Sequence, residues 1–462
     1  MKPGGLSPRI FSLIIADAAI IYGGLILAMY IRLGSDGSMY ELDEKNGWLK
    51  IALVCIFCIV NLYFYDLYDY VVMTNRRELM LRLVQALGIA WALLALVFYF
   101  VPSLMVGRGI SIISVPLVLV FLLTWRVFIH VLTGHPEIGE KILVVGTGKA
   151  ALDTAEAVWE RRDAGYRIVG FVSENGAKPR EKLGRSEILG KAHDLEGIIR
   201  SEKIDRVVIA VRERRGAFPT EALLKMSLAG DVSIEECTSF FERITGKVHL
   251  DMVRPSWLIF AGRQRDSRVK AAFREGVHRG LALVGLTLSL PIAVLTAALI
   301  KVESRGPVFY RQERVGKNGK TFDVIKFRSM RTDAEADGTP VWAVDNDKRV
   351  TLVGKVIRKI RVDEIPQFWN ILKGEMNFVG PRPERPHFVK QLATEVHYYE
   401  HRHLVAPGLT GWAQIKYPYG ASVDDAIQKL QYDLYYIKNQ SLTLDLVIVV
   451  DTFKTVLFGK GR

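Results

Sequence analysis

Cysteine is scarce in this sequence of 462 residues, which contains only Cys55, Cys58 and Cys237. Three thiols exclude a disulfide framework and a zinc site with four thiolates. Cys55 and Cys58 form a C-x-x-C pair, but the pair lies inside an apolar run, which favours two small membrane-helix residues over a redox or metal site. We therefore expect reduced thiols in a protein that faces the cytoplasm.

Charge is ordinary in amount: charged residues make up 24% of the sequence, whereas hydrophobic residues make up 50% and aromatic residues 10%. This composition excludes a mostly disordered chain, and the length favours two to four domains. The mean hydropathy of +0.17 is unusual for a wholly soluble protein. The formal net charge of +13 fits nucleic acid, anionic lipid or a phosphorylated substrate, and charge alone does not choose among them.

Four apolar runs occupy the first part of the chain, and each is close to the ~20 residues that a helix needs to cross a bilayer core. They are Ile10–Ile31, Trp48–Tyr65, Leu83–Val101 and Ile110–Val131. The first is not a cleavable signal peptide, because it is too long, has no small-residue cleavage site and precedes three more runs. We predict a helical membrane bundle of four spans over residues 1–134.

The charges between these runs predict the orientation of the bundle. Basic residues precede the first run and separate the second from the third, whereas the loop after the first run is acidic: Lys2, Arg9, Arg76, Arg77 and Arg82, against Asp36, Glu41, Asp43 and Glu44. By the positive-inside rule the N-terminus is cytoplasmic, and the chain is cytoplasmic again near residue 135. Asp17 is the one carboxylate within a run, and helix packing is favoured over a functional site.

Residues 135–262 have the pattern of a Rossmann-like cytoplasmic domain, similar to CoA-binding domains. The segment Lys141–Ala151 is a short apolar strand, a turn with Gly146 and Gly148, and the start of a helix. Two further apolar strands follow, so we predict a parallel, doubly wound sheet ending near residue 260. The glycines would let a phosphate approach the helix, but Ala151 holds the third fingerprint position and no clear ribose-binding acid follows the second strand. A structural or regulatory module is favoured over a nucleotide site.

The uncharged run Gly280–Ile300 is long enough to be a fifth membrane span. Basic residues flank both of its ends, which favours both ends on the cytoplasmic side. Pro291 lies at its centre, where it removes a helix hydrogen bond, and the Ser289 hydroxyl could meet the freed backbone group. We therefore favour a re-entrant helix over about residues 278–301 that enters the inner leaflet, bends at Ser289–Pro291 and returns.

The last third of the sequence, residues 263–462, contains the residues that suit catalysis. Pro366 and Gly374 predict a helix that starts at the proline and stops before the glycine, so Asp363 and Glu364 lie at its N-terminal edge. There the helix dipole favours ionised carboxylates. Adjacent carboxylates near arginines suit a diphosphate with a divalent cation, although most Asp-Glu pairs are solvated helix caps and a basic patch could bind lipid headgroups.

Two arginines precede this acid pair. Arg358 and Arg361 are three residues apart, so on a helix both guanidiniums could face one point.

Five ordered motifs make this region similar to the bacterial sugar transferase family. They are Gly306-Pro-Val-Phe-Tyr, Lys326-Phe-Arg-Ser-Met, Asp363-Glu-Ile-Pro-Gln-Phe-Trp-Asn, Val379-Gly-Pro-Arg-Pro and Pro407-Gly-Leu-Thr-Gly-Trp-Ala-Gln. The four spans and the Rossmann-like domain also resemble the large members of this family, the monotopic phosphoglycosyl transferases that act on polyprenyl phosphate. The resemblance thus covers the whole chain and implies an α-rich catalytic domain with a re-entrant membrane helix.

The resemblance implies a role for each matching residue. Asp363 would be the nucleophile on the sugar-bearing phosphate and Glu364 the ligand of Mg²⁺. The Pro-Arg-Pro motif and nearby basic residues would bind the nucleotide sugar and its phosphates: Pro381, Arg382, Pro383, Arg314, Lys326, Arg328, Arg358 and Arg361. The family's helix break at Ser-Pro falls on Ser289 and Pro291, which Leu290 separates here.

The implied reaction moves a sugar 1-phosphate from a UDP-sugar to undecaprenyl phosphate and releases UMP, at the cytoplasmic face of a bacterial inner membrane. Membrane lipid is an expected partner, and a homodimer stays open. A membrane-bound nucleotide-sugar dehydratase is the alternative, but no tyrosine after residue 280 has a lysine four positions on, as that class requires. A membrane nucleotide sensor would leave the C-terminal motifs unused. We expect no nucleic-acid partner, because basic residues alternate with carboxylate and proline motifs.

Overall fold

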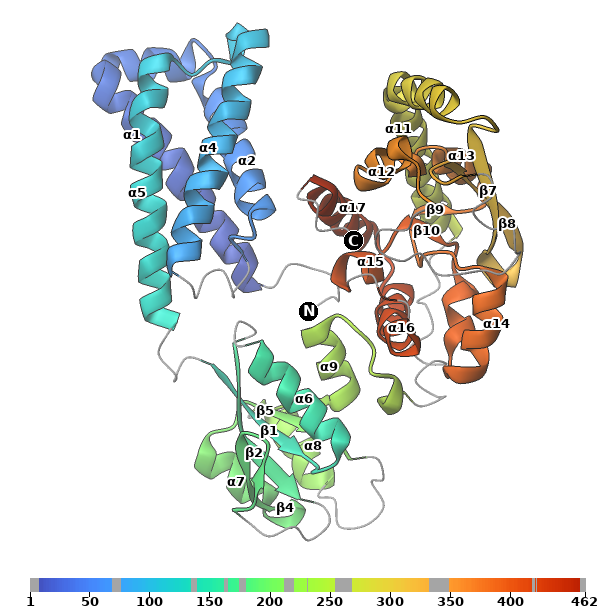
Figure 1. The fold of residues 1–462 in the computed structure, drawn as a ribbon. Coiled ribbons are helices and arrows are strands. Elements are labelled where there is room, and N and C mark those ends of the chain that lie inside the picture. Colours follow the sequence, from blue (N-terminus) through green and yellow to red (C-terminus); the bar gives the residue numbers. More distant parts are fainter. Residues whose placement is uncertain are drawn as a thin grey trace.

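The computed structural model describes most of the chain, and Figure 1 shows it as three bodies: a blue helical bundle, a green sheet domain and a yellow-to-red domain. The described residues are 8–68, 76–133, 139–161, 165–173, 180–211, 220–230, 232–253, 268–331, 349–417, 420 and 422–457. The predicted domain boundaries, at 134/135 and 262/263, lie outside these residues, as does Lys2. All statements below concern the described part of the chain.

The N-terminal bundle has a helix at each of the four predicted apolar runs. Its helices are α1 (Pro8–Asp43), α2 (Gly47–Phe64), α4 (Arg76–Phe100) and α5 (Arg108–Thr133), with the short turn η1 (Pro102–Leu104) between the last two. Helix α1 packs on α2 and α5, and α2 packs on α4. The acidic segment after the first run is not the loop that we predicted: α1 kinks at Gly34, which has a φ of 71°, and continues as helix to Asp43.

Two buried charges hold the bundle together. Asp17 on α1 and Arg126 on α5 are almost fully buried, and the Arg126 Nη2 atom lies 2.5 Å from Asp17 Oδ2. Arg126 Nη1 also donates a hydrogen bond to the Leu67 carbonyl at 2.9 Å, after the end of α2. Asp17 therefore joins two helices, as a packing role requires. Cys55 and Cys58 are free thiols buried in the same bundle.

The middle domain is a six-stranded sheet with helices on both faces. Its elements are β1 (Glu140–Val145), α6 (Lys149–Glu160), β2 (Tyr166–Ser173), β3 (Lys182–Leu183), β4 (Ser186–Lys191), η3 (Ala192–Asp194), α7 (Leu195–Glu202), β5 (Arg206–Ile209), α8 (Thr220–Ala229), β6 (Ser233–Glu236), α9 (Cys237–Thr245) and η4 (Leu250–Met252). The strand order is β3-β4-β2-β1-β5-β6. The prediction of a doubly wound sheet is confirmed, but the sheet is mixed, because the edge strand β3 is antiparallel to β4.

The C-terminal domain is rich in helices around two small sheets. Its elements are α11 (Arg268–Glu303), β7 (Phe309–Val315), η5 (Lys317–Gly319), β8 (Thr321–Phe327), α12 (Leu352–Lys359), η6 (Val362–Glu364), α13 (Gln367–Lys373), β9 (Asn377–Val379), α14 (Pro386–Glu395), η7 (Tyr399–Leu404), β10 (Gly408–Thr410), α15 (Trp412–Lys416), α16 (Val423–Lys438) and α17 (Leu442–Leu457). Strands β7 and β8 form an antiparallel hairpin, whereas β9 and β10 are parallel.

Helix α11 contains the uncharged run, and it starts ten residues before the predicted bound. It stays helical through Pro291, and the Ser289 hydroxyl donates a hydrogen bond to the Leu286 carbonyl at 3.2 Å. Figure 1 shows its olive N-terminal half and its yellow C-terminal half running in different directions. With the four bundle helices, α11 is one of five described helices long and apolar enough to cross a membrane. The re-entrant course stays a prediction.

Two of the basic residues that flank this run lie inside the protein. Arg274 Nη2 donates a hydrogen bond to Gln440 Oε1 at 2.9 Å, and His278 Nε2 lies 3.4 Å from Asp445 Oδ2. Both side chains are buried. Arg274 and His278 therefore pack against the segment at the start of α17. Because they are buried there, they give weaker support to the prediction that the N-terminal end of the run lies on the cytoplasmic side.

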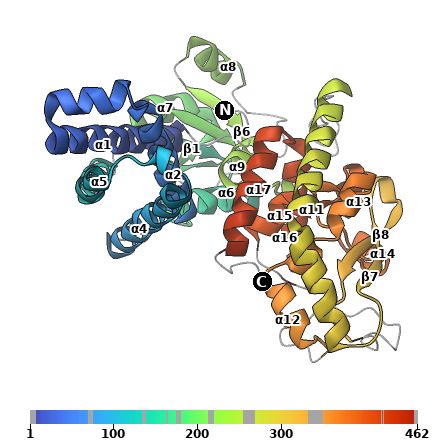
Figure 2. The ribbon, with the colours of Figure 1, turned by 90° about the horizontal axis from the view of Figure 1, so that it is seen from above.

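The C-terminal domain contacts both other bodies, and Figure 2 shows α17 on the side that faces the bundle. Tyr63 at the end of α2 donates a hydrogen bond to Asp451 Oδ1 at 2.8 Å, and Lys454 pairs with Asp66. Residues 246–253, called the strap below, leave α9 and pack into the C-terminal domain. Within the strap, Val248 lies in one apolar cluster with residues of α14 and α16.

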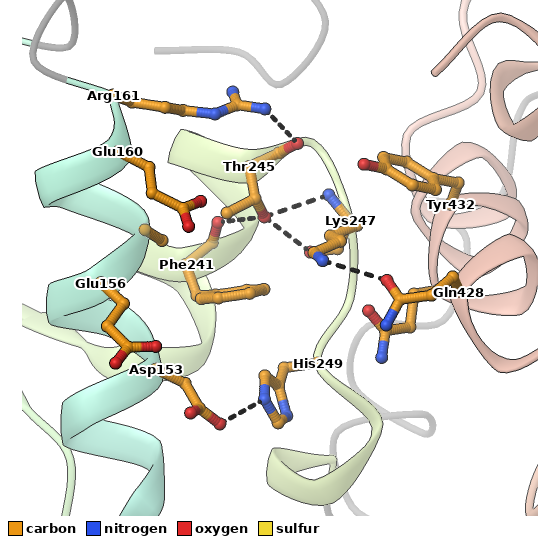
Figure 3. A pocket seen from close by; sticks show the side chains of 12 residues that line it. Asp153, Glu156, Glu160, Arg161, Phe241, Thr245, Lys247, His249, Gln428 and Tyr432 are labelled. Atoms are coloured by element: carbon orange, nitrogen blue, oxygen red, sulfur yellow. Dashed lines mark hydrogen bonds and ion pairs between the residues drawn. The ribbon is translucent and has the colours of Figure 1, made fainter. Parts of the chain in front are cut away.

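A cleft of about 310 Å³ lies between the middle domain and α16 (Figure 3). Three carboxylates of α6 line one wall, and polar residues of α16 line the other. His249 Nε2 lies 2.9 Å from Asp153 Oδ2, and Lys247 Nζ donates a hydrogen bond to Gln428 Oε1 at 3.2 Å. None of the predicted site residues lines this cleft.

Candidate active site

The two predicted catalytic carboxylates lie in a tight turn between α12 and α13. Helix α12 ends at Lys359, Arg361 adopts a left-handed conformation with a φ of 58°, and Asp363 and Glu364 follow in η6. Both carboxylates are buried, with 8% and 9% of their surface exposed. They are thus not the solvated helix caps that an Asp-Glu pair usually forms.

The helix after the acid pair agrees with the sequence prediction. Helix α13 runs from Gln367 to Lys373, with Pro366 as its first flanking residue and Gly374 just after its end. Gly374 has a φ of 82°, which only glycine adopts without strain, so the helix stops there. The two turn residues read from the sequence therefore set the position of the dyad.

Three cations surround one oxygen of Glu364. Its Oε1 atom lies 3.1 Å from Arg382 Nη2, 3.3 Å from Lys326 Nζ and 3.6 Å from Arg361 Nη1. Burial alone would raise the pKa of Glu364, but the positive charges of Lys326, Arg382 and Arg361 hold this pKa well below its usual value. Glu364 is therefore ionised at any physiological pH.

Asp363 has a different environment from its neighbour. Burial, and then the negative charge of Glu364, raise the pKa of Asp363 to about 6, although Lys326, Arg361 and Arg358 oppose the rise. Its Oδ1 atom is buried and has no hydrogen-bond partner among the described residues. An unpaired buried oxygen costs about 1–3 kcal/mol, so it calls for an explanation at this position. Cations therefore fix the Glu364 carboxylate, whereas one oxygen of Asp363 has no hydrogen-bond partner among the described residues.

The spacing of Arg358 and Arg361 predicted that both lie on one helix and face one point. In the structure they do not share a helix. Arg358 lies in the last turn of α12, whereas the left-handed Arg361 falls after the helix has ended. Arg361 nevertheless reaches Glu364, and Arg358 is close enough to lower the pKa of Asp363. Both cations therefore act on the dyad, but through a backbone reversal that the residue spacing does not reveal.

The Pro-Arg-Pro segment delivers its arginine to the dyad. Arg382 contacts Glu364, while the carbonyl of Pro383 accepts a hydrogen bond from Arg314 Nη1 at 3.0 Å. Arg314 also donates to Gln312 Oε1 and lies 3.3 Å from Glu384 Oε2, so its guanidinium is engaged within the protein. The structure thus brings Lys326, Arg361 and Arg382 together, with Arg314 beside them.

Arg328 does not join this cluster, although it lies in the same motif as Lys326. Its side chain is 6% exposed and donates hydrogen bonds to the carbonyls of Ser304 at 2.8 Å and Arg305 at 3.0 Å. Both carbonyls follow Glu303, the last residue of α11, and Nη2 also donates to the Ile300 carbonyl in the last turn at 3.4 Å. Arg328 therefore binds the backbone at the end of α11 and is not among the cations around Glu364, so these contacts give no support to its predicted role in phosphate binding.

The remaining predicted residues lie elsewhere. Ser289 and Pro291 are in the middle of α11. Gly146 and Gly148 are in the middle domain, between β1 and the start of α6. Their turn lies at the carboxyl end of β1, next to β5, where doubly wound sheets bind ligands. The preference for a structural or regulatory module over a nucleotide site stays a prediction.

Sequence reasoning missed Asn370, which positions Lys326. The Asn370 side chain is fully buried on α13, accepts a hydrogen bond from the Ile325 N–H at 3.1 Å and donates to the Asp323 carbonyl at 2.8 Å. Asn370 thereby ties α13 to β8, the strand that carries Lys326. The only sequence signal for a role of Asn370 was its place at the end of the motif that begins at Asp363.

The donor set fits Mg²⁺ only together with a phosphate ligand. Within the described residues, no three His, Cys, Asp or Glu side chains come together as a metal site. Glu364 would supply a hard oxygen ligand with Asp363 beside it, and Mg²⁺ usually binds one or two carboxylates plus substrate phosphates. The unpaired Asp363 Oδ1 is consistent with such an arrangement.

Comparison with known proteins identifies the families that two parts of the chain resemble. The family model described as bacterial sugar transferase matches residues 269–459, and the CoA-binding domain model matches residues 64–217. An exopolysaccharide production protein, PSS, of Rhizobium leguminosarum bv. phaseoli is 39% identical over 189 residues, which are 39% of this chain and 93% of that protein. The chain belongs to the bacterial sugar transferase family. The region matched by this model contains the dyad and all three cations around Glu364.

Longer relatives in this bacterial sugar transferase family match more of the chain. The UDP-N-acetylgalactosamine-undecaprenyl-phosphate N-acetylgalactosaminephosphotransferase of Aeromonas hydrophila is 42% identical over 56% of this chain and 60% of its own length. The undecaprenyl-phosphate glucose phosphotransferase of Komagataeibacter xylinus is 33% identical over 72% of this chain and 62% of its own length. The chain thus spans about three fifths of these two relatives.

Proposed function

We propose that this protein transfers a sugar 1-phosphate from a UDP-sugar to undecaprenyl phosphate and releases UMP, as the first step in building an exopolysaccharide or O-antigen-type polysaccharide. The names of the relatives support the donor and acceptor classes. The observation that carries the proposal is the contrast within the dyad. Glu364 is held by three cations, whereas the adjacent Asp363 keeps a buried oxygen without a partner.

The proposed reaction has two steps. The Asp363 carboxylate forms a bond to the sugar-bearing phosphorus, and the bond from that phosphorus to the UMP oxygen breaks, so UMP leaves. An oxygen of the lipid phosphate then attacks the same phosphorus and displaces Asp363. No proton transfer is needed in either step, because both nucleophiles are anions. The two substrates therefore need not occupy the site together.

The charges near the dyad suit this chemistry. A carboxylate is a weak nucleophile, so the phosphate oxygens must be neutralised before it can attack. Arg361, Arg382 and Lys326 place three positive charges on Glu364, the residue next to Asp363, and their contacts with Glu364 hold them there. We propose Glu364 as the protein ligand of Mg²⁺, which would polarise the phosphate oxygens.

We propose that the site lies on the cytoplasmic face of the inner membrane. Apolar residues of α11 are exposed along its length, such as Leu288 at 75%. Helix α12, which leads into the dyad, exposes Leu352 and Val356 one turn apart, and Ile360 follows at its C-cap. The exposed Lys355 and Lys359 lie beside this apolar stripe. Such a stripe beside a membrane helix suits a bilayer surface, where the lipid acceptor lies.

The dehydratase alternative has no support from the matched families. The CoA-binding domain model covers the sheet domain only in part, and what the middle domain binds stays a prediction. The hexose also stays to be found, since one relative is named for N-acetylgalactosamine and another for glucose.

The test is UMP release by the purified full chain with UDP-sugars and Mg²⁺, first without acceptor. The two-step route predicts UMP in an amount comparable to enzyme, and one hexose phosphate added to the Asp363 peptide. Asp363→Asn should lose both, Glu364→Gln should lose most turnover, and Glu313→Gln, on the exposed hairpin, should lose neither. A ternary-complex rate pattern with no adduct would instead make Asp363 a general base.

A further inference from the structure

The backbone around the Pro-Arg-Pro motif is held through its carbonyl groups. Four consecutive carbonyls accept hydrogen bonds from other parts of the domain: Pro381 from Gly408 N–H at 2.9 Å, Arg382 from Arg402 Nη2 at 3.0 Å, Pro383 from Arg314 Nη1 at 3.0 Å, and Glu384 from Val315 N–H at 2.9 Å. Proline has no N–H to donate, so this segment can be fixed chiefly through its carbonyls. Only two of these four donors are side chains.

Arg402 is the buried donor of the two. It lies in η7 with 7% of its surface exposed. Its Nη1 donates to the Tyr399 hydroxyl at 2.6 Å, its Nη2 lies 2.9 Å from Asp433 Oδ2, and its guanidinium stacks over the Tyr399 ring. Asp433 on α16 is itself 2% exposed. This guanidinium is therefore fully engaged by protein groups and does not contact the dyad.

We propose that Arg402 is a positioning residue, which holds the backbone of Arg382 so that the Arg382 guanidinium stays on Glu364; this inference rests on the proposed function. The Arg382 side chain is one-third exposed and has many rotamers, so a contact at its tip needs an anchored backbone. Arg402 anchors the Arg382 backbone and is itself held by Asp433 of α16. The dyad thus depends on a buried ion pair outside the motifs that surround it.

The conservative variant Arg402→Lys tests this without removing the charge that Asp433 needs. A single ammonium cannot reproduce the fork that serves Asp433, Tyr399 and the Arg382 carbonyl together. We expect kcat/KM for UMP release to fall about 10- to 100-fold, as expected for a misplaced binding group. Arg243→Lys, which changes a partly buried arginine paired with Glu235 in the middle domain, is the matched control and should keep full activity.

A double-mutant cycle with Arg382→Met separates positioning from a general structural role. If Arg402 acts through Arg382, the double variant Arg402→Lys, Arg382→Met should be no slower than Arg382→Met alone. If the two losses multiply instead, Arg402 acts by another route and the proposal fails. Thermal melting of each variant identifies any loss that comes from unfolding.

Hydrogen exchange gives a readout that needs no activity. In Arg402→Lys, amides of a peptide covering residues 379–388 should exchange faster than in the wild type, and in Arg243→Lys they should not. Unchanged exchange in Arg402→Lys would overturn the proposal. If the wild type releases no UMP from any UDP-sugar, the proposed function fails, while the exchange result still decides whether Arg402 holds this segment.

Discussion

The backbone N–H of Val248 donates a hydrogen bond to the carbonyl of Gln431 at 3.0 Å, and this bond joins the strap to α16. The strap follows the middle domain in sequence and bridges the two domains: His249 pairs with Asp153 of α6, whereas Val248 packs into the C-terminal domain. Val248 is 1% exposed, and the Trp412 indole N–H donates to the Gly246 carbonyl at 2.7 Å. The packing of the C-terminal domain therefore includes residues before 263.

This packing predicts how truncated chains behave. All matched catalytic motifs lie after residue 300, so a fragment starting at residue 263 should keep UMP release in lipid. Without the strap it loses the burial of Val248, worth about 1.5–3 kcal/mol. A fragment starting at residue 245 should therefore melt at a higher temperature than one starting at residue 263. Equal melting temperatures would show that the strap contributes nothing.

Arg328 and Lys326 should differ in what they affect, although one motif contains both. Arg328→Gln removes hydrogen bonds from a charged group to the end of α11, each worth about 1.5–3 kcal/mol, so it should lower the melting temperature. Lys326→Met should instead lower the rate of UMP release, because Lys326 contacts Glu364. A raised KM for the UDP-sugar in a stably folded Arg328→Gln would return Arg328 to the substrate site.

Local sequence signals predicted the elements that depend on neighbouring residues. Pro366 and Gly374 predicted both ends of α13, and the apolar runs predicted the four bundle helices. The prediction that Arg358 and Arg361 share one helix was wrong. A left-handed arginine is rare, and nothing in the local pattern requires one at Arg361. Likewise, the kink at Gly34 let a charged segment stay helical.

Contacts between distant segments could not be read from the sequence. Lys326 meets Glu364 from a strand 38 residues earlier, and the motif resemblance alone put them in one site. Asn370 and Arg402 bind backbone groups, and a side chain that binds backbone needs no complementary residue type in the sequence. Such positioning residues therefore appear only once the fold is known.

The course of α11 predicts a labelling pattern. In a chain without its three native cysteines, single cysteines at Val269 and Lys301, both exposed near the ends of α11, report on the two sides of the membrane. If α11 is re-entrant, both should be shielded from a membrane-impermeant thiol reagent in whole cells and both should react after lysis. Labelling of one position alone in whole cells would show a fifth crossing.

The raised pKa of Asp363 predicts the pH dependence of the first step. Only the ionised carboxylate can attack phosphorus, so the rate constant for the single release of UMP should be level above pH 7 and should fall as the pH drops through about 6. An ordinary aspartate would lose activity only near pH 4. UMP release should be followed without acceptor, because a phosphate monoester such as the lipid acceptor itself titrates near pH 6.

Variants of the neighbouring charges should move this acid limb in opposite directions. Glu364→Gln removes a negative charge that raises the pKa of Asp363, so its residual activity should persist to lower pH. Lys326→Met removes a positive charge that lowers the same pKa, so its activity should fall at higher pH than in the wild type. Glu313→Gln, at an exposed position of the β7–β8 hairpin, should leave the limb in place. If both active-site variants keep the wild-type midpoint, the group that titrates in the acid limb is not Asp363. The prediction that ionised Asp363 sets this limb would then be wrong.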